Sequence, residues 1–332
     1  MAFERKPRVM SGMRPTGGLH IGHLVGVLTQ WRDYCDSAEA YFEIADIHAY
    51  TTGFDNPQAI RDERNEMVAV WLAAGVDPTK ATIFLQSAVP EIAELHLLLS
   101  MVTPLSWLER VPTYKGQIEA LGAEIATYGF LGYPLLQLCD IAVVRGERVP
   151  VGRDQVAHLE FGREVVRRFN HLYGAGSEVL VEPQPTLSEF AEVPGTDGRK
   201  MSKSYDNAIL IADDEATTTQ RIRTMFTDPQ KLRKGDPGRP EICPVFALWK
   251  LVPEAALERI AAECRSGALG CVADKAAFAE ALNAYLAPVR ERYRLFRSDP
   301  GEVERIIAEG TARTRAVAGE VLADVKRAMK LL

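Results

Sequence analysis

Short apolar segments alternate with longer amphipathic ones through the first half of this 332-residue chain. The apolar segments, residues 8–11, 39–45 and 81–86, are predicted as strands, and residues 21–34 and 56–74 are predicted as the helices between them. Strands separated by helices at this spacing predict βαβ units, and therefore an α/β fold with a Rossmann-type parallel sheet. From about residue 213 onward the periodicity is helical, which predicts a smaller all-helical C-terminal domain.

Composition narrows the class of protein further. The formal net charge is −6, from 39 Lys and Arg against 45 Asp and Glu, so a uniformly basic nucleic-acid binder is excluded. Five scattered cysteines predict reduced thiols and a cytoplasmic location. The most apolar stretch, residues 95–102, is less than half the length of a membrane span, so no membrane association is expected.

The first segment that carries chemistry is residues 11–26, SGMRPTGGLHIGHLVG. A turn rich in Gly and Pro leads from a strand into a helix N-terminus, a place that receives phosphate because its N–H groups are unsatisfied. His20 and His23 lie on one helix face and can donate to phosphate oxygens, while Gly22 lets a flat group approach the backbone. The alternative is a pair of polar surface residues at an ordinary helix start.

The second segment is residues 193–207, VPGTDGRKMSKSYDN, which is polar and is predicted to be a mobile loop between two domains. Lys200 and Lys203 carry point charges on long stems, so they suit a polyphosphate leaving group over which they can close. Solvated surface lysines are the alternative.

Together, HIGH at residues 20–23 and KMSKS at residues 200–204 resemble the two signatures of class I aminoacyl-tRNA synthetases, with the order and separation of the tryptophan and tyrosine branch. Further segments resemble tryptophanyl-tRNA synthetases: residues 44–51 (IADIHAYT), 81–90 (ATIFLQSAVP), 107–115 (WLERVPTYK), 132–140 (GYPLLQLCD) and 149–158 (VPVGRDQVAH). Tyrosine stays open as an alternative substrate, since tyrosine enzymes share the pattern Y-x-x-x-Q-x-x-D. The stretches SGMRPTG, LERVPTYK and VPVGRDQ favour tryptophan.

Tyr133, Gln137 and Asp140 are spaced by four and three residues, which places them on one face of a predicted helix among leucines. A polar stripe in apolar surroundings suits an aromatic amino acid. The resemblance implies that Asp140 accepts the indole N–H and that Tyr133 and Gln137 hold the α-amino group. A capping or salt-bridged Asp140 is the alternative, because a buried carboxylate needs a partner.

A predicted strand that ends at Gly152 would present Asp154 and Gln155 at the carboxyl edge of the sheet, where such folds bind ligands. By resemblance, Asp154 is expected to accept a hydrogen bond from the ribose of ATP. Arg14 stands where Gln is common in the family, which leaves its contact with the ATP phosphates open.

The resemblance implies three sets of site residues. The catalytic set is His20, His23, Lys115, Lys200 and Lys203. The ATP-binding set is Arg14, Pro15, Thr16, Gly22, His23, Gly152, Arg153, Asp154, Val193, Lys200, Met201, Ser202, Lys203 and Ser204. The tryptophan-binding set is Tyr133, Gln137, Asp140, Gln155, His48, Val149 and Val151.

The implied activity is ATP-dependent conversion of L-tryptophan to tryptophanyl-adenylate, followed by transfer to the 3′ end of tRNA(Trp), with Mg²⁺ and in a homodimer. The implied domains are a catalytic domain (1–192), the KMSKS loop (193–207), an anticodon-binding helical domain (208–310) and a terminal helix that packs back on the catalytic domain (311–332). The basic run of residues 221–239 would hold RNA phosphates. A nucleotidyltransferase without a tRNA partner and a paralogue with a regulatory role are the alternatives.

The cysteines allow one more comparison. Some tryptophanyl enzymes carry a C-x22-C-x6-C-x2-C iron–sulfur site. Here Cys243, Cys264 and Cys271 fit it with a shorter first gap, and Asp274 stands in the fourth position. A cluster normally needs four thiolates, so no iron–sulfur cluster and no protein-bound metal are expected.

Overall fold

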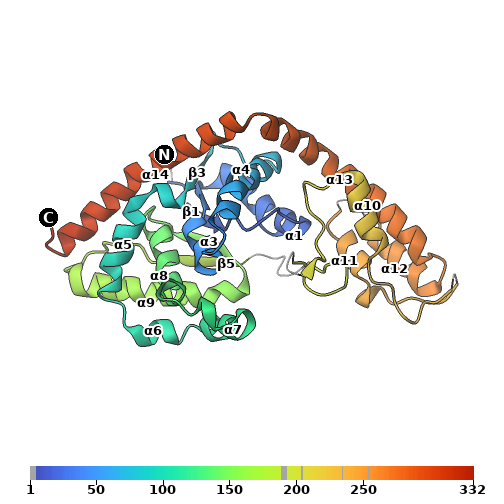
Figure 1. The fold of residues 1–332 in the computed structure, drawn as a ribbon, viewed down its shortest axis with the longest axis horizontal. Coiled ribbons are helices and arrows are strands. Elements are labelled where there is room, and N and C mark those ends of the chain that lie inside the picture. The colour runs from blue at the N-terminus through green and yellow to red at the C-terminus, as the bar shows by residue number, and fades with distance from the viewer. Residues whose placement is uncertain (1–4, 188–192, 203–204, 234, 253–254) are drawn as a thin grey trace.

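The computed structural model describes residues 5–187, 193–202, 205–233, 235–252 and 255–332, apart from the side chains at positions 113, 115, 117, 120, 121 and 154. Its centre is a five-stranded parallel sheet in the order β3-β2-β1-β4-β5 (Figure 1). The strands are β1 (Arg8–Met13), β2 (Glu39–Ile44), β3 (Ala81–Leu85), β4 (Arg148–Val151) and β5 (Gln184–Leu187). The order reverses between β1 and β4, and folds of this type bind ligands at the carboxyl ends of the strands there.

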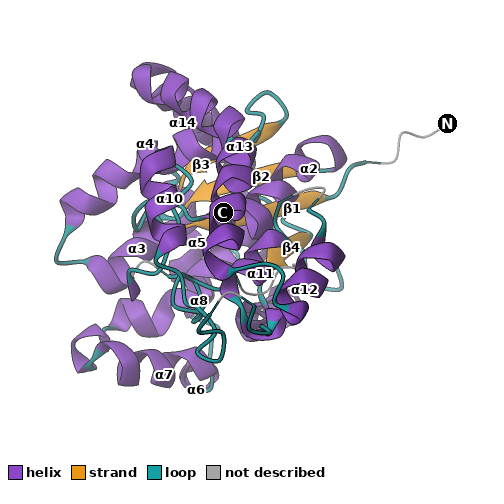
Figure 2. Ribbon diagram, turned by 90° about the vertical axis from the view of Figure 1, so that its right-hand side faces the viewer, coloured by secondary structure: helices purple, strands orange, loops and turns teal. Residues whose placement is uncertain are grey.

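Helices cover the sheet on both faces (Figure 2). In this part of the chain they are α1 (Ile21–His23), α2 (Thr29–Ser37), α3 (Asp46–Gly53), α4 (Pro57–Ala73), α5 (Pro90–Ser100), α6 (Leu105–Glu109), α7 (Pro112–Leu121), α8 (Tyr128–Ala142) and α9 (Val156–Tyr173). A π-helical turn over Leu24–Leu28 joins α1 to α2. The helix predicted over residues 21–34 is therefore continuous but changes its winding directly after the second histidine.

Residues of β2 alternate between two apolar layers, because successive side chains of a strand point to opposite faces. Phe42 packs in the layer beneath α2 and α4, where the Trp31 ring stacks on it at 4.2 Å between centroids. Tyr41 packs in the layer beneath α5 and α8. Burial on both faces is the usual condition of a parallel sheet and confirms the predicted α/β fold.

The described residues of the C-terminal part form helices and loops and no strand, as predicted. It comprises α10 (Glu215–Arg223), α11 (Pro244–Trp249), α12 (Leu257–Ser266), α13 (Cys271–Ser298) and α14 (Pro300–Ala328). The two long helices α13 and α14 form an arc along one side of the molecule (Figure 1). No helix in the described part of the chain is long and apolar enough to cross a membrane.

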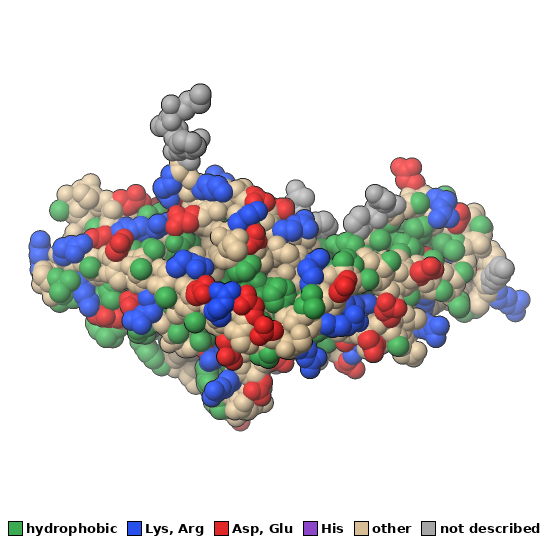
Figure 3. Space-filling view, turned by 90° about the horizontal axis from the view of Figure 1, so that it is seen from above, with side chains coloured by type: hydrophobic (Ala, Val, Ile, Leu, Met, Phe, Trp, Pro, Cys, Tyr) green, Lys and Arg blue, Asp and Glu red, His purple; other side chains and the backbone are tan. Residues whose placement is uncertain are grey.

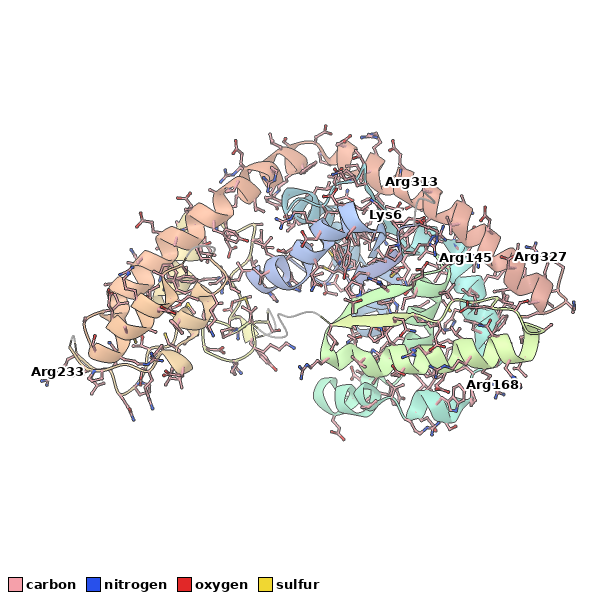
Figure 4. The ribbon with its side chains drawn as sticks, turned by 180° about the vertical axis from the view of Figure 1, so that it is seen from behind. Lys6, Arg145, Arg168, Arg233, Arg313 and Arg327 are labelled. Atoms are coloured by element: carbon pink, nitrogen blue, oxygen red, sulfur yellow. The ribbon has the colours of Figure 1, made fainter. Side chains whose placement is uncertain are left out.

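Helix α14 covers the outer edge of β3. The Leu85 N–H donates to Thr311 Oγ1 at 3.1 Å, and a Cβ added at Gly310 would lie only 1.9 Å from the Ile83 carbonyl oxygen. An ion pair between Arg145 and Asp324 ties the far end of α14 to the turn before β4, close to Arg327 (Figure 4). The helix thus protects an edge that would otherwise present unpaired backbone groups.

The sequence prediction differs from the structure in several places. The strand predicted over residues 8–11 continues through Met13, because Gly12 and Met13 still pair with Glu43 and Ile44 of β2. Helices α3, α5, α6, α7 and α9 and strand β5 were not predicted individually.

Candidate active site

A cavity of about 360 Å³ lies at the carboxyl ends of β1 and β4. Strand β1 and the turn after it contribute Ser11, Gly12, Met13 and Arg14, and β4 and the residue after it contribute Val149, Val151 and Gly152. The other walls come from α1, α3, α8 and the start of α9, through His23, His48, Tyr133, Gln137, Asp140 and Gln155. The predicted amino-acid residues and part of the predicted ATP residues therefore share one cavity.

The HIGH segment folds tightly against itself. The His20 backbone N–H donates to His23 Nδ1 at 3.2 Å, and the two ring centroids are 3.8 Å apart. A Cβ added at Gly22 would lie 2.9 Å from His20 Nδ1 and 3.4 Å from the Val193 Cβ. The flat group that approaches Gly22 in this structure is thus the His20 imidazole. Among the described residues His23 lines the cavity and His20 stands beside it, half-buried.

Backbone hydrogen bonds join the HIGH segment to the chain that follows the KMSKS segment. The Ile21 N–H donates to the Ile209 carbonyl at 3.0 Å, and the Ile211 N–H donates to the Leu19 carbonyl at 2.9 Å. The chain that leaves the KMSKS segment therefore pairs with the backbone of the HIGH segment.

Residues 193–202 of the predicted loop form a folded hairpin. The Met201 N–H donates to the Val193 carbonyl at 2.8 Å, and Met201 is buried in the apolar layer. The buried Asn207 side chain accepts from the Ser202 N–H at 2.8 Å and donates to the Lys200 carbonyl at 3.1 Å. Lys200 is exposed on this hairpin. Two further predicted ATP-binding residues, Lys203 and Ser204, lie outside the described residues.

The amino-acid end of the cavity is built on α8. Tyr133, Gln137 and Asp140 line it together, as their spacing predicts. Asp140 is 2% exposed; its Oδ2 lies 2.8 Å from His48 Nε2, and its Oδ1 accepts from Gln86 Nε2 at 2.9 Å. The Asp140 carboxylate is therefore a buried, hydrogen-bonded acceptor whose partners fix its orientation.

Gln86 is a site residue that the sequence analysis missed. It is fully buried, and its Oε1 accepts from the backbone N–H groups of Ile47 and His48 at 3.0 and 3.2 Å. Its amide thus connects the start of α3 to Asp140 on α8. A polar residue at the end of the apolar run ATIFLQ is the signal that could have identified it, since the carboxyl ends of parallel strands meet at one edge.

His158 was also missed, although it closes one of the matching segments. It is buried, with Nε2 3.0 Å from the Tyr133 hydroxyl and Nδ1 2.8 Å from Gln155 Oε1. It therefore links two of the predicted amino-acid residues.

A third missed residue, Glu43 on β2, lines the cavity and is 2% exposed. Burial, and then the neighbouring Asp140 carboxylate, raise the pKa of Glu43 well above its ordinary value. Its position on a strand predicted only as apolar gave no sign of this environment.

The remaining predicted residues are placed in several ways. Arg14 Nη1 lies 3.5 Å from Thr52 Oγ1 at the mouth of the cavity, Pro15 is buried, and Thr16 and Arg153 are exposed. The side chains of Lys115, which belongs to α7, and Asp154 lie outside the described part of the structure.

The three C-terminal cysteines and Asp274 meet at a small cavity of about 20 Å³. Lys231 also lines it and donates from Nζ to the Cys264 carbonyl at 3.2 Å, and Asp274 Oδ1 accepts from Trp249 Nε1 at 2.9 Å. No group of three or more His, Cys, Asp or Glu in the described residues is arranged to hold a metal ion. The absence of an iron–sulfur cluster stays a prediction.

The predicted basic surface over residues 221–239 is only partly present. Arg221 pairs with Asp206 and Arg239 pairs with Asp228 at 2.6 Å, so both charges have an acidic partner. Lys231 is 7% exposed, so the prediction of a surface charge is wrong for this residue. The contact with RNA phosphates stays a prediction. Arg233 is exposed and lies at the far tip of the helical part (Figure 4). Acidic and basic side chains are interspersed on the face shown in Figure 3.

A doubly wound parallel sheet with HIGH after its first strand, a hairpin over residues 193–202 next to Gly22, and a cavity with polar and apolar walls is the arrangement expected of a class I aminoacyl-tRNA synthetase. Residues 1–287 match the model of the family described as tRNA synthetases class I (W and Y). The chain therefore belongs to the tryptophan and tyrosine family of class I aminoacyl-tRNA ligases.

The relatives of this chain span its full length. It is 45% identical over 329 residues to the tryptophan–tRNA ligase of Thermotoga maritima, a match that covers 98% of this chain and 99% of that one. It is 40% identical to the tryptophan–tRNA ligase of Aquifex aeolicus, covering 98% and 100%. The crystal structure of tryptophanyl-tRNA synthetase from Campylobacter jejuni complexed with ADP and tryptophan superposes with a TM-score of 0.87 at 32% identity, covering 97% and 99%.

Proposed function

We propose that this chain is a tryptophan–tRNA ligase, which activates L-tryptophan with ATP and transfers it to the 3′ end of tRNA(Trp). One observation carries the proposal: a single cavity joins a buried acceptor among apolar walls, Asp140, to the HIGH histidine His23. The full-length relatives named tryptophan–tRNA ligase support the choice of amino acid.

In the amino-acid half, Asp140 accepts the indole N–H while His48 and Gln86 hold its carboxylate in place. Val149 and Val151 supply apolar walls for the ring. The α-amino group needs hydrogen-bond acceptors, and Tyr133, Gln137 and Gln155 supply them. This arrangement binds an aromatic amino acid that carries one ring donor.

In the ATP half, His23 and the turn of Arg14, Pro15 and Thr16 face the phosphates, and the turn at Gly152, Arg153 and Asp154 takes the ribose and base. Gly22 and Val193 hold His20 against the backbone. Met201, Ser202 and Ser204 bind ATP together with Lys200 and Lys203 of the same motif, and Lys115 contacts the ATP phosphates. These roles follow the resemblance of the motifs.

Two displacements make up the reaction. A tryptophan carboxylate oxygen attacks the α-phosphorus of ATP, the bond to the β-phosphate oxygen breaks, and pyrophosphate leaves. A hydroxyl of the terminal tRNA ribose then attacks the activated carbonyl carbon, and AMP leaves. The chain contributes positioning and charge: His20 and His23 stabilise the α-phosphate, and Lys200 and Lys203 neutralise pyrophosphate.

Magnesium fits this scheme as a companion of the nucleotide. The described residues include no carboxylate cluster suited to a cation, and Mg²⁺ commonly takes its ligands from substrate phosphates and water. When bound with ATP, it supplies further charge neutralisation to the leaving group.

The assembly and location are also part of the proposal. Four large apolar side chains between residues 97 and 128 are more than half exposed, which supports a homodimer: Leu97, Met101, Leu105 and Tyr128. We place the catalytic domain at residues 1–192, the loop at 193–207, the anticodon-binding helices at 208–310, and the terminal helix, packed on the catalytic domain, at 311–332. The protein acts in the cytoplasm, where tRNA is charged.

Amino-acid-dependent ATP–pyrophosphate exchange, run in parallel with tryptophan and tyrosine, tests the activity. Exchange with tryptophan only, followed by charging of tRNA(Trp), supports the proposal. Exchange with tyrosine only would assign the chain to the other branch, and no exchange would favour a paralogue with a regulatory role.

The role of the KMSKS loop has its own test. Lys203→Ala is expected to reduce exchange by orders of magnitude while tryptophan binding stays near normal, because the lysine acts on the leaving group. Unchanged exchange in that variant would contradict the role.

A further inference from the structure

Three buried carboxyl groups meet where β2 and α8 reach the cavity. Asp46, Asp140 and Glu43 are each at most 2% exposed. The first two have donors: Asp46 pairs with Arg64, and Asp140 bonds to His48 and Gln86. No ion pair with a described Lys or Arg involves Glu43. Burying an isolated carboxylate costs free energy, so the burial of Glu43 without a cationic partner needs another explanation.

Glu43 has one carboxyl oxygen without a hydrogen-bond donor in the described part of the structure. Its Oε1 is buried and has no hydrogen-bond donor among the described residues. The polar side chain in hydrogen-bonding contact with it is Asp140, a carboxylate. On the side of β1 there is no room for a further side chain, since a Cβ added at Gly12 would lie 3.1 Å from Glu43 Oε2. A proton between the two carboxyl groups is what satisfies both of them.

We propose that Glu43 is a neutral carboxylic acid that donates its O–H to Asp140, and that this shared proton positions Asp140 for the amino-acid substrate. The inference deepens the proposed function and rests on the contact of Asp140 with tryptophan. Glu43 is thus a positioning residue that acts through its neighbour.

The proton belongs on Glu43 because the two carboxyl groups differ in their other partners. Asp140 already receives donors from Gln86 Nε2 and His48 Nε2, which stabilise its negative charge. Glu43 faces the charge of Asp140 from α8 and that of Asp46 from α3. Other ionisable groups near this cluster are Arg64 on α4, which pairs with Asp46, and His96 on α5, whose pKa is lowered by burial. Arg14, His23, Tyr133 and His158 line the same cavity.

The pH dependence of the Michaelis constant for tryptophan tests the proposal in the full-length enzyme. Pyrophosphate exchange should show a KM for tryptophan that rises about tenfold as the solution becomes alkaline, because ionised Glu43 loses its hydrogen bond and repels Asp140. The KM for ATP should stay constant over that range. In Glu43→Gln the amide cannot ionise and still has N–H donors, so the alkaline rise should disappear.

Two further variants sharpen the result. Glu43→Ala removes the donor at every pH, so its KM for tryptophan should be about tenfold above that of Glu43→Gln even at neutral pH. Asp274→Asn is the matched control, since Asp274 is a buried carboxyl on α13 whose pKa burial also raises. It should keep the alkaline rise. The same pH profile in wild type and Glu43→Gln would overturn the proposal.

Infrared spectroscopy gives a readout that does not depend on folding of the Glu43 variants. The Asp274→Asn protein should show at neutral pH the C=O stretching band of a protonated carboxyl group, which shifts in D₂O. Absence of that band would overturn the inference. An enzyme that shows the band but no tryptophan-dependent exchange would instead refute the proposed function.

Discussion

Replacement of Gln86 by leucine is the sharpest test of how the amino-acid end of the cavity is built. The change keeps the approximate volume but removes the donor to Asp140 Oδ1 at 2.9 Å and the acceptor for the His48 N–H at 3.2 Å. The Ile47 N–H loses one acceptor and keeps a second, Asp46 Oδ1 at 3.1 Å. Asp140 Oδ1 and the His48 N–H therefore lose a hydrogen-bond partner, and the Ile47 N–H keeps one of its two acceptors.

The magnitude follows from these contacts. A hydrogen bond to a charged group contributes about 1.5–3 kcal/mol, and a buried donor left unsatisfied costs about 1–3 kcal/mol. We therefore expect Gln86→Leu to lower the free energy of unfolding by about 3–6 kcal/mol. Loss of the Gln86–Asp140 bond alone should raise the KM for tryptophan by about 10- to 100-fold, since 1.4 kcal/mol corresponds to a factor of ten.

Gln58 on α4 offers a matched control. Its Nε2 also donates to a carboxylate, Asp62 Oδ1 at 2.6 Å, but on the exposed face of the helix. Such a pair contributes about 0.5 kcal/mol or less, so Gln58→Leu should leave both stability and KM nearly unchanged. Urea unfolding and pyrophosphate exchange measure the two quantities. If Gln86→Leu and Gln58→Leu changed the free energy of unfolding and the KM for tryptophan equally, burial would not explain the effect of Gln86.

Three further predictions follow from close contacts and burial. Gly22→Ala should reduce the rate of adenylate formation by about tenfold or more with tryptophan binding retained, because the new Cβ would lie 2.9 Å from His20 Nδ1 and push the ring away. Pre-steady-state kinetics measure this rate, and a normal rate would contradict the contact. Gly310→Ala should lower the free energy of unfolding by roughly 3 kcal/mol or more, since its Cβ would strike a β3 carbonyl at 1.9 Å. The control Gly319→Ala, with open space on the same helix, should stabilise by about 0.5–1 kcal/mol in urea unfolding. The pKa of His96 is lowered from 6.5, chiefly by burial, so the unfolded state binds the proton more readily and stability should fall as pH drops below about 6.5. In His96→Gln the free energy of unfolding should depend less on pH below about 6.5, as measured by urea unfolding at several pH values. An unchanged pH dependence would mean that another group causes it.

Much of the fold and part of the site could be predicted from local pattern. The alternation of apolar and amphipathic segments predicted the parallel sheet, and steps of four and three residues placed Tyr133, Gln137 and Asp140 on one face of α8. These predictions succeeded because helix and strand periodicity depend on neighbours along the chain. The signature motifs were equally readable, since each is a short contiguous segment.

Long-range neighbours were outside the reach of such reasoning. Arg221 and Arg239 look like free positive charges in the sequence, yet the fold pairs them with Asp206 and Asp228. Likewise, the backbone ladder between the HIGH segment and residues 209–211 joins parts of the chain that have no local relation. Which charges are neutralised, and which segments are joined by hydrogen bonds, depends on the path of the chain through space.

The sequence by itself determined most of the element types, the sheet class and, by resemblance, the family, and it placed Tyr133, Gln137 and Asp140 on one helix face. Only the tertiary structure decided that Gln86 would hold Asp140 and that Glu43 would lie against it in a buried place. The physical reason is that hydrogen bonding, desolvation and charge repulsion depend on distance in space. Strand order and the position of α8 over the sheet set those distances, and no local pattern encodes them.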